Sequence, residues 1–239
     1  MITYIEMHAA VLGMGFWARG ITFQNTAGAS GLQAVALLVG ADLAAFYECS
    51  VEGYQDTLYV HSGRQFFIKC MVKGTIDFIF GNAAVVFQLC HIMVRKPNQG
   101  QRNMVTAQGR TDQNQDTGIV IHKCNIGPTD DLKAVQKNFP TYLGRPWKKF
   151  SRTVVMNSVI GDVIHKEGWF PWYGDFALDT LHYREYQNTG PGSNTLNRVK
   201  WKGWGVIKDR KEAETFTVAN FIKGWGWLRH TNFPFLPAL

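Results

Sequence analysis

The chain of 239 residues lacks the features that mark several protein classes. It has no run of about 18 apolar residues, which a membrane-spanning helix requires. Glu6, His8 and Arg19 interrupt the N-terminal stretch, so this stretch does not have the pattern of a secretory signal peptide. No Asn-x-Ser/Thr acceptor for N-glycosylation is present, although this absence is only weak evidence against secretion. We therefore expect a soluble chain without a readable targeting signal.

Two kinds of catalytic or metal-binding motif are also missing. The four cysteines form no Cys-x-x-Cys pair, which argues against the common zinc and redox motifs. No serine lies in a Gly-x-Ser-x-Gly turn, which argues against a hydrolase of the Ser-His-Asp type with that motif.

The composition is that of a folded, basic chain. A hydrophobic content of 46% is enough for a sizeable core, and the length fits one domain, which we assign to residues 1–239. The net charge of +7 and the isoelectric point near 9.3 favour an anionic partner. Nucleic acid, an anionic membrane surface and an acidic polysaccharide all satisfy that condition. The chain has no nucleic-acid recognition motif and no dense basic run, so the first of these is not favoured.

An internal repeat predicts the fold. Each cysteine has an apolar residue three positions before it and another two positions after it. The four segments are AFYECSVEG (45–53), FFIKCMVKG (66–74), VFQLCHIMV (86–94) and VIHKCNIGP (120–128). Short β-type segments that return after about 20 residues or more, with Gly, Asn and Asp between them, indicate a solenoid. We predict an all-β, right-handed parallel β-helix with inserted loops and an irregular C-terminal segment.

Two further segments extend the repeat. VVMNSVIGD (154–162) has Ser158 in the place of the cysteine, and FWARGITFQ (16–24) approximates the pattern with Gly20 there. In stacked coils, Cys49 and Cys70 would lie about one strand spacing apart, which is close enough for a disulfide. A ladder of buried, reduced thiols has the same spacing, so the sequence leaves both states open.

Polar residues recur at the coil period. The separation of Gln33 from Gln55 equals that of Gln55 from Asp77, and Asp56 is next to the middle residue. These residues would share one angular position on three successive coils, which favours a groove over a core. A solvated polar ladder, with Asp77 facing water beside Ile76, is the alternative.

Such a row permits a defined chemistry. Of two close carboxyl groups in a partly apolar cleft, one keeps its proton while the other stays charged. Converging glutamine amides can stabilise an oxyanion. Arg145, in LGRPW (143–147), could keep the charged carboxylate ionised. The set indicates acyl transfer or glycoside cleavage.

Several long motifs resemble the plant-type pectin methylesterases, which remove methyl esters from homogalacturonan. The resemblance runs from about residue 12 to the C-terminus. The motifs that carry it are QAVALLVGADLAAFY (33–47), YQDTLYVHSGRQFF (54–67), GTIDFIFGNAAVVFQ (74–88), NMVTAQGRTD (103–112), TYLGRPWKKFSRTVV (141–155) and GWFPWYGDFALDTLHYREYQNTGPG (168–192), with FPF near the end. The family fold is a right-handed parallel β-helix, in agreement with the repeat.

The resemblance implies a role for each catalytic residue. Asp77 would be the nucleophile, and Asp56 the general acid and then the general base. Gln33 and Gln55 would form the oxyanion hole, with Gln33 also available to position substrate. Arg145 would hold Asp77 ionised.

Three aromatic residues match positions that contact the sugar in this family: Trp147, Phe80 and Trp172. On residue type alone, Phe80 is more often a core residue and Trp147 could be packing. The resemblance implies no metal and no organic cofactor. The implied partners are methyl-esterified homogalacturonan and a proteinaceous pectin methylesterase inhibitor, with no nucleic acid and no membrane. We expect a monomer that is secreted to the cell wall.

The chain also departs from the family pattern. The usual Gly-Asp-Gly-Phe is Gly13-Met14-Gly15-Phe16 here, and Leu38 replaces a basic residue. Family catalytic domains have further N-terminal coils, so we expect the first coil to expose an apolar edge, prone to aggregation or dimerisation. An inactive remnant that binds pectin or a protein partner is therefore the alternative to an active esterase.

Overall fold

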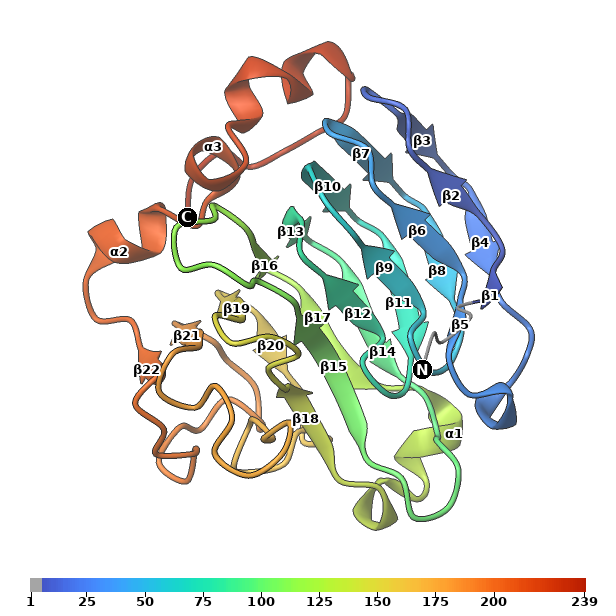
Figure 1. The fold of residues 1–239 in the computed structure, drawn as a ribbon, viewed down its shortest axis with the longest axis vertical. Coiled ribbons are helices and arrows are strands. Elements are labelled where there is room, and N and C mark those ends of the chain that lie inside the picture. The colour runs from blue at the N-terminus through green and yellow to red at the C-terminus, as the bar shows by residue number, and fades with distance from the viewer. Residues whose placement is uncertain (1–5) are drawn as a thin grey trace.

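Single residues with positive φ alternate with short apolar strands and wind the chain into coils. The computed structural model describes residues 6–239. Each complete coil passes through three parallel sheets, here called sheets I, II and III, which form the walls of the solenoid (Figure 1). The fold is the right-handed parallel β-helix that the repeat predicted.

The strands of each sheet come from successive coils and all pair in parallel. Sheet I contains β2 (Ala10–Val11), β6 (Leu37–Val39), β9 (Leu58–Val60), β12 (Ile79–Gly81), β15 (Asn103–Gln108) and β18 (Thr141–Gly144). Sheet II contains β3 (Trp17–Arg19), β7 (Ala44–Tyr47), β10 (Arg64–Ile68), β13 (Ala84–Gln88), β16 (Gly118–His122), β19 (Arg152–Met156), β21 (His182–Tyr186) and β22 (Trp204–Val206). Sheet III contains β4 (Thr22–Gln24), β8 (Ser50–Glu52), β11 (Met71–Gly74), β14 (His91–Val94), β17 (Asn125–Pro128) and β20 (Val159–Ile160).

The remaining elements are short. Strand β1 (Glu6–Met7) pairs with β5 (Ala34–Val35) outside the three sheets. The α-helices are α1 (Asp130–Lys133), α2 (Arg210–Glu214) and α3 (Val218–Phe221). The 3-10 helices are η1 (Ala29–Gly31), η2 (Gln136–Asn138), η3 (Gly224–Gly226) and η4 (Leu228–His230). Among residues 6–239, no helix has the length and apolar character needed to cross a membrane.

Stacked aromatic rings fill the interior of the solenoid. Phe46, Phe67 and Phe87 occupy one register position on β7, β10 and β13. Their ring centroids are 4.4 and 4.8 Å apart, and the rings are nearly parallel. This spacing matches the distance between paired strands, so the coil stacking sets the aromatic stacking.

The cysteines form a ladder of free thiols at the corner between sheets II and III. All four are buried and unbridged, so the reduced alternative is the one found. The backbone N–H of Cys70 donates to Cys90 Sγ at 3.3 Å, and the N–H of Cys90 donates to Cys124 Sγ at the same distance. Ser158 continues the ladder, because its Oγ accepts from the N–H of Cys124 at 3.0 Å.

The predicted place of Gly20 in this ladder was wrong by one residue. The register of β3 with β7 sets Gly20 opposite Glu48, and Ile21 opposite Cys49. Glu48 has a φ of 53° and Gly20 a φ of 66°, so both occupy the left-handed position that turns the chain before the ladder. Glycine meets that requirement without strain, which explains its presence there.

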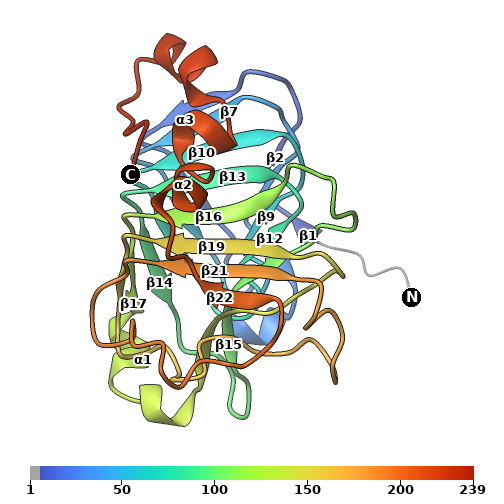
Figure 2. The ribbon, with the colours of Figure 1, turned by 90° about the vertical axis from the view of Figure 1, so that its left-hand side faces the viewer.

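The C-terminal segment covers the outer face of sheet II. Helices α2 and α3 lie in front of this sheet in Figure 2. Apolar residues of the segment, such as Phe216 and Leu228, pack on outward-facing residues such as Phe66 and Val154. The central strands of sheet II, from β7 to β19, are therefore buried on both faces, which explains why they are nearly continuous apolar runs. The prediction of an irregular C-terminal segment is confirmed.

The coil of β2, β3 and β4 is the outermost coil of the described residues. Each of these strands pairs with one neighbour only. Leu12, Met14, Trp17 and Ile21 on this coil are exposed. The apolar edge expected from the sequence is present in the structure.

Candidate active site

A small cavity of about 210 Å³ opens on the outer face of sheet I, whose strands cross the middle of Figure 1. Six of the eight predicted site residues line it. The lining residues are Gln33, Asp56, Asp77, Phe80, Ala107, Trp147 and Trp172.

Local backbone geometry presents the two carboxyl groups. Asp56 and Asp77 have φ values of 59° and 51°, and each lies two residues before a strand of sheet I. Aspartate is one of the few non-glycine residues that adopt this left-handed conformation readily. Phe78, directly after Asp77, packs into the interior of the solenoid, while Asp77 lines the cavity. Asp77 therefore lies on the outer side of the sheet, but it is buried in the cavity rather than solvated.

The coil register sets the two aspartates side by side. Leu58 of β9 pairs with Ile79 of β12, so Asp56 and Asp77 occupy equivalent positions on adjacent coils. Paired strands lie about 4.8 Å apart, which brings the two carboxyl groups within range of strong mutual repulsion.

The predicted single column of Gln33, Gln55 and Asp77 was wrong in one position. Gln33 and Gln55 do pair, on adjacent coils. The repeat from β6 to β9, in which Leu37 pairs with Leu58, has the same length as the repeat from β9 to β12. The extra residue lies between Gln33 and β6, where the backbone N–H groups of Ala36 and Leu37 both donate to the carbonyl of Thr57. Ile76 is therefore opposite Gln55, and Asp77 is opposite Asp56. The regular register of β9 with β12 is what aligns the two carboxyl groups.

The two glutamines differ in their access to the cavity. Gln33 is exposed and lines it. Gln55 is half-buried, and its pairing with Gln33 holds it beside the cavity rather than in the lining.

Arg145 binds Asp77 through two hydrogen bonds. Nε donates to Oδ1 at 2.8 Å and Nη2 donates to Oδ2 at 2.6 Å, which is the bidentate geometry of the strongest arginine–carboxylate pairs. Arg145 directly follows β18, and its backbone N–H donates to the carbonyl of Thr106 on β15. The guanidinium carbon lies 4.3 Å from the centroid of the Trp172 ring, which covers it.

The surroundings affect the pKa of the two carboxyl groups differently. Both are only 6% exposed. Burial and then the charge of Asp77 raise the pKa of Asp56 to about 8, against the opposing effects of Arg145 and Gln33. Burial raises the pKa of Asp77 as well, but the hydrogen bonds and charge of Arg145 oppose that rise. Asp56 is therefore the carboxyl group that holds a proton at neutral pH, next to an Asp77 carboxylate held by Arg145.

An aromatic wall stands beside the carboxyl groups. The rings of Tyr59 and Phe80 stack with centroids 4.4 Å apart, and Trp147 meets Phe80 nearly edge-on at 5.9 Å. A side chain at Gly109 would lie 2.8 Å from the Trp147 ring, so the glycine is what lets this ring lie against the backbone. Phe80 and Trp147 thus belong to a small cluster outside the main core.

The sequence reasoning missed Tyr59 and Ala107. They share one register row with Phe80, on β9, β15 and β12. Tyr59 lies three residues after Asp56, as Phe80 lies three residues after Asp77, and this repeated spacing could have identified it. Ala107 follows a longer loop and leaves no comparable signal. Among residues 6–239, no group of three or more His, Cys, Asp and Glu side chains is arranged to hold a metal ion.

The chain is similar to known pectin-modifying enzymes. The model of the family described as Pectinesterase matches residues 1–225. A pectinesterase of Daucus carota is 64% identical over 233 residues, which are 98% of this chain and 73% of the relative. "Pectinesterase/pectinesterase inhibitor 3" of Arabidopsis thaliana is 63% identical over 98% of this chain, but the chain spans only 39% of that protein.

Two solved structures extend the comparison. The structure of pectin methylesterase from carrot superposes with a TM-score of 0.95 at 65% identity, over 97% of this chain and 72% of that one. The pectin methylesterase of Aspergillus niger, in deglycosylated form, gives a TM-score of 0.77 at 34% identity, over 92% of this chain and 68% of that one.

The raised pKa of Asp56 predicts how stability depends on pH. The pKa of the folded state, about 8, exceeds the unfolded value of 3.8, so this group lowers the free energy of unfolding progressively as pH rises between these values. Asp56→Asn removes that loss. The free energy of unfolding of Asp56→Asn, relative to that of the parent, should therefore increase by at most about 1.4 kcal/mol per pH unit across this window.

Urea unfolding at several pH values between 4 and 8 measures this effect. Asp162→Asn, at an exposed carboxyl group, is the matched control and should follow the parent at every pH. Parallel curves for the parent and Asp56→Asn would show that Asp56 is ionised in the folded protein near neutral pH.

Proposed function

The chain belongs to the pectinesterase family, and we propose that it is a pectin methylesterase, which hydrolyses the methyl esters of homogalacturonan to methanol and de-esterified pectin. The observation that carries this proposal is the pairing of an arginine-bound Asp77 with a buried Asp56 of raised pKa. A carboxylate and a carboxylic acid side by side are a nucleophile and a proton donor. The same two groups are what ester hydrolysis through a covalent intermediate needs.

In the first half of the reaction, a carboxylate oxygen of Asp77 attacks the ester carbonyl carbon. The carbonyl electrons move to the oxygen, and the Gln33 and Gln55 amides donate hydrogen bonds to this oxyanion. When the carbonyl forms again, the bond to the methoxy oxygen breaks and Asp56 gives its proton to that oxygen. Methanol leaves, and the sugar is joined to Asp77 as an acid anhydride.

In the second half, Asp56 is a carboxylate and acts as a general base. It takes a proton from water while the water oxygen attacks the same carbonyl carbon. The bond to Asp77 breaks, which releases a galacturonate carboxylic acid that loses its proton to solvent. Asp77 is again a carboxylate bound to Arg145, and Asp56 is again protonated, so the cycle closes.

The aromatic wall and the charge of the chain support a polyuronate substrate. Trp147, Phe80 and Trp172 border the carboxyl groups, and aromatic faces pack well on the apolar faces of sugar rings. The net charge of +7 attracts an acidic polymer. Homogalacturonan is a polymer of the cell wall, so we propose an extracellular location there. Binding of a proteinaceous inhibitor stays a prediction.

Replacing the nucleophile tests the proposal directly. Asp77→Asn should abolish methanol release from highly methyl-esterified pectin, because the amide is a poor nucleophile and loses the ion pair with Arg145. The parent and Asp162→Asn should both release methanol. Circular dichroism shows whether each protein is folded. No release from a folded parent would refute esterase activity and favour a pectin-binding chain, while release by Asp77→Asn would exclude Asp77 as nucleophile.

The glutamines have a different expected effect. Gln33→Ala and Gln55→Ala should each lower kcat by about 10²–10³-fold with little change in KM, because oxyanion donors act mainly in the transition state. Steady-state kinetics on esterified pectin measures both constants, with the exposed Gln99→Ala as control. A change in KM alone, at either position, would show that the residue binds substrate and does not stabilise the oxyanion. This outcome matters most for Gln55, which does not line the cavity.

The arginine should control the acidic side of the pH profile. Methanol release rises with pH as Asp77 ionises and falls above about pH 8 as Asp56 loses its proton. Arg145→Ala removes the cation that opposes the raised pKa of Asp77, so the rising limb should move upward by about 1–3 pH units. Arg229→Ala, at an exposed arginine, should leave the limb in place. An unmoved limb in Arg145→Ala would contradict this role.

A further inference from the structure

A second, larger cavity of about 770 Å³ lies around the corner from the active site. It opens between the outer face of sheet II and the C-terminal segment. Figure 2 shows α2 and α3 of this segment in front of the sheet. Five of its lining residues are basic or histidine: Arg64, Arg152, His182, Lys211 and Lys223. We call the cavity bordered by these residues the cationic groove.

The floor of the cationic groove is one register row. The first residues of β10, β13, β16, β19 and β21 are paired in sequence across sheet II, namely Arg64, Ala84, Gly118, Arg152 and His182. The two residues in the middle of the row are small, and charged or polar residues flank them. Three strand spacings separate Arg64 from Arg152, or about 14 Å. This row forms a trough that is long enough for an extended chain segment.

Gly118 keeps this trough open. A Cβ atom at this position would lie 3.0 Å from Cδ of Arg152, so the stem of Arg152 lies directly over the glycine. Any larger residue would push the arginine away from the sheet and fill the middle of the row.

The groove retains positive charge after its internal ion pairs are counted. Arg64 is neutralised by Asp42 through hydrogen bonds of 2.6 and 3.0 Å, and Glu214 by Arg210 at 2.8 Å. The net charge of the groove is therefore determined by its remaining charged residues.

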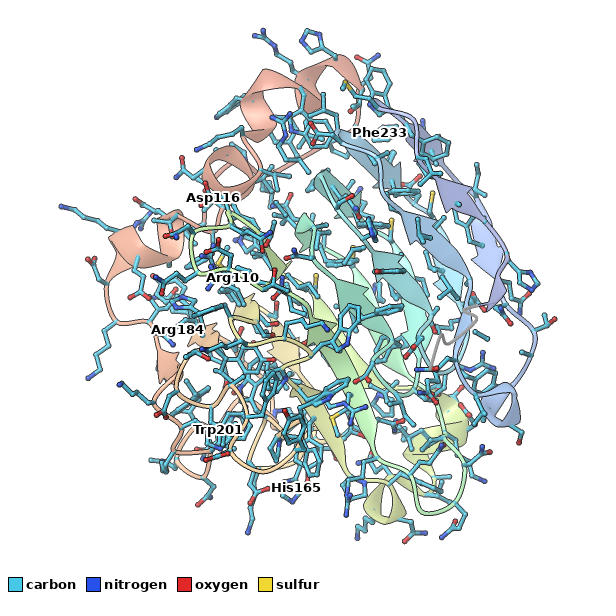
Figure 3. All side chains as sticks on the ribbon, viewed as in Figure 1. Arg110, Asp116, His165, Arg184, Trp201 and Phe233 are labelled. Carbon is cyan, nitrogen blue, oxygen red and sulfur yellow. The ribbon has the colours of Figure 1, made fainter. Side chains whose placement is uncertain are left out.

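Three cations remain. Within residues 6–239, no carboxylate lies within 4.0 Å of the charged groups of Arg152, Lys211 or Lys223. Asp116 is the one acidic lining residue outside these pairs, and it lies close to Arg110 in Figure 3. The groove therefore has an excess of positive charge.

His182 adds a neutral polar group. Its Nε2 is buried without a hydrogen-bond partner in the described part of the chain. Burial, with smaller effects of Arg184 and Arg110, lowers the pKa of His182 to about 4, so the imidazole is uncharged at neutral pH. The Phe216 ring lies 5.8 Å from it, and Phe221 also lines the cavity. Cations and aromatic faces together match an acidic carbohydrate better than a simple anion.

We propose that the cationic groove is a second, non-catalytic binding site for de-esterified segments of homogalacturonan. The identity of the ligand rests on the proposed function, which makes such acidic segments the reaction product. Carboxylates of the polymer would pair with Arg152, Lys211 and Lys223. The site recognises the charge that the active site creates.

The position of the groove fits this role. Only two residues separate the end of β12 in sheet I from the start of β13 in sheet II. The floor row therefore begins directly past the turn that borders the active-site sheet. A polymer bound in both places would keep its de-esterified part on the protein while the next esterified sugars stay near Asp77.

Cross-linking locates the binding site. A fully de-esterified galacturonate oligomer is incubated with the full chain, and a carbodiimide then couples sugar carboxylates to lysine amines. Peptide mass mapping should find the oligomer on Lys211 and Lys223, at a level at least about tenfold above that on the exposed Lys137 and Lys208. Equal labelling of all four lysines would mean unspecific attraction by net charge and would overturn the proposal.

Equilibrium binding of the same oligomer gives a second test. Arg152→Gln/Lys211→Gln should weaken binding at least about tenfold, because two charge-assisted contacts are lost. Lys137→Gln/Lys208→Gln removes the same charge outside the groove and should change binding less than about twofold. Equal effects of the two pairs would overturn the proposal.

Methanol release by the parent is measured in parallel, so the two proposals can fail separately. Release without selective cross-linking would leave the esterase and refute the second site. Selective cross-linking without release would support the groove as a polyuronate site on a chain that is not an esterase. If a double-stranded nucleic acid of the same charge competed with the oligomer at equal concentration, the carbohydrate assignment would be wrong.

Discussion

The in-register stacking of parallel coils is the constraint on which the rest of this structure depends. A coil can stack only if the chain turns at the same angular positions each time, and residues with positive φ supply one of these turns. Glu48, Lys69, Leu89, Lys123 and Asn157 form a continuous row of such residues. Because non-glycine side chains pay a conformational cost there, the row persists only where the buried strands on either side fix it. The aromatic stack and the thiol ladder are consequences of that register.

The same constraint explains how a buried carboxyl pair can exist. Asp56 and Asp77 are neighbours because β9 and β12 pair in regular register and each aspartate lies two residues before its strand. Their repulsion in a nearly dry site costs stability, and the fold offsets part of this cost with Arg145, which β18 presents from two coils away. The raised pKa of Asp56 is thus a consequence of the stacking, because stacking buries this carboxyl group and holds the charge of Asp77 beside it.

Much of the fold and site could be predicted from residues that repeat at a regular period. Cysteine spacing indicated the solenoid, and the equal separations of Gln33, Gln55 and Asp77 indicated a functional row. The extra residue between Gln33 and β6 was missed, since such a small shift is visible only in strand pairing. Tyr59 could have been predicted as a site residue by analogy with Phe80. Ala107 was not, because the long connection before β15 removes the period from the sequence.

The cationic groove could not be predicted from the sequence repeat. Its floor residues are adjacent in space, but Ala84, Gly118 and Arg152 are separated by loops of unequal length, and the lysines come from a segment outside the repeat. Only the pairing of strands brings them into one row. The stacking that aligns Asp56 with Asp77 also aligns this row, which lies just past the corner between sheets I and II. A polymer that crosses this corner would contact both sites. The solenoid therefore couples the site of ester cleavage to a surface suited to the acid that cleavage produces.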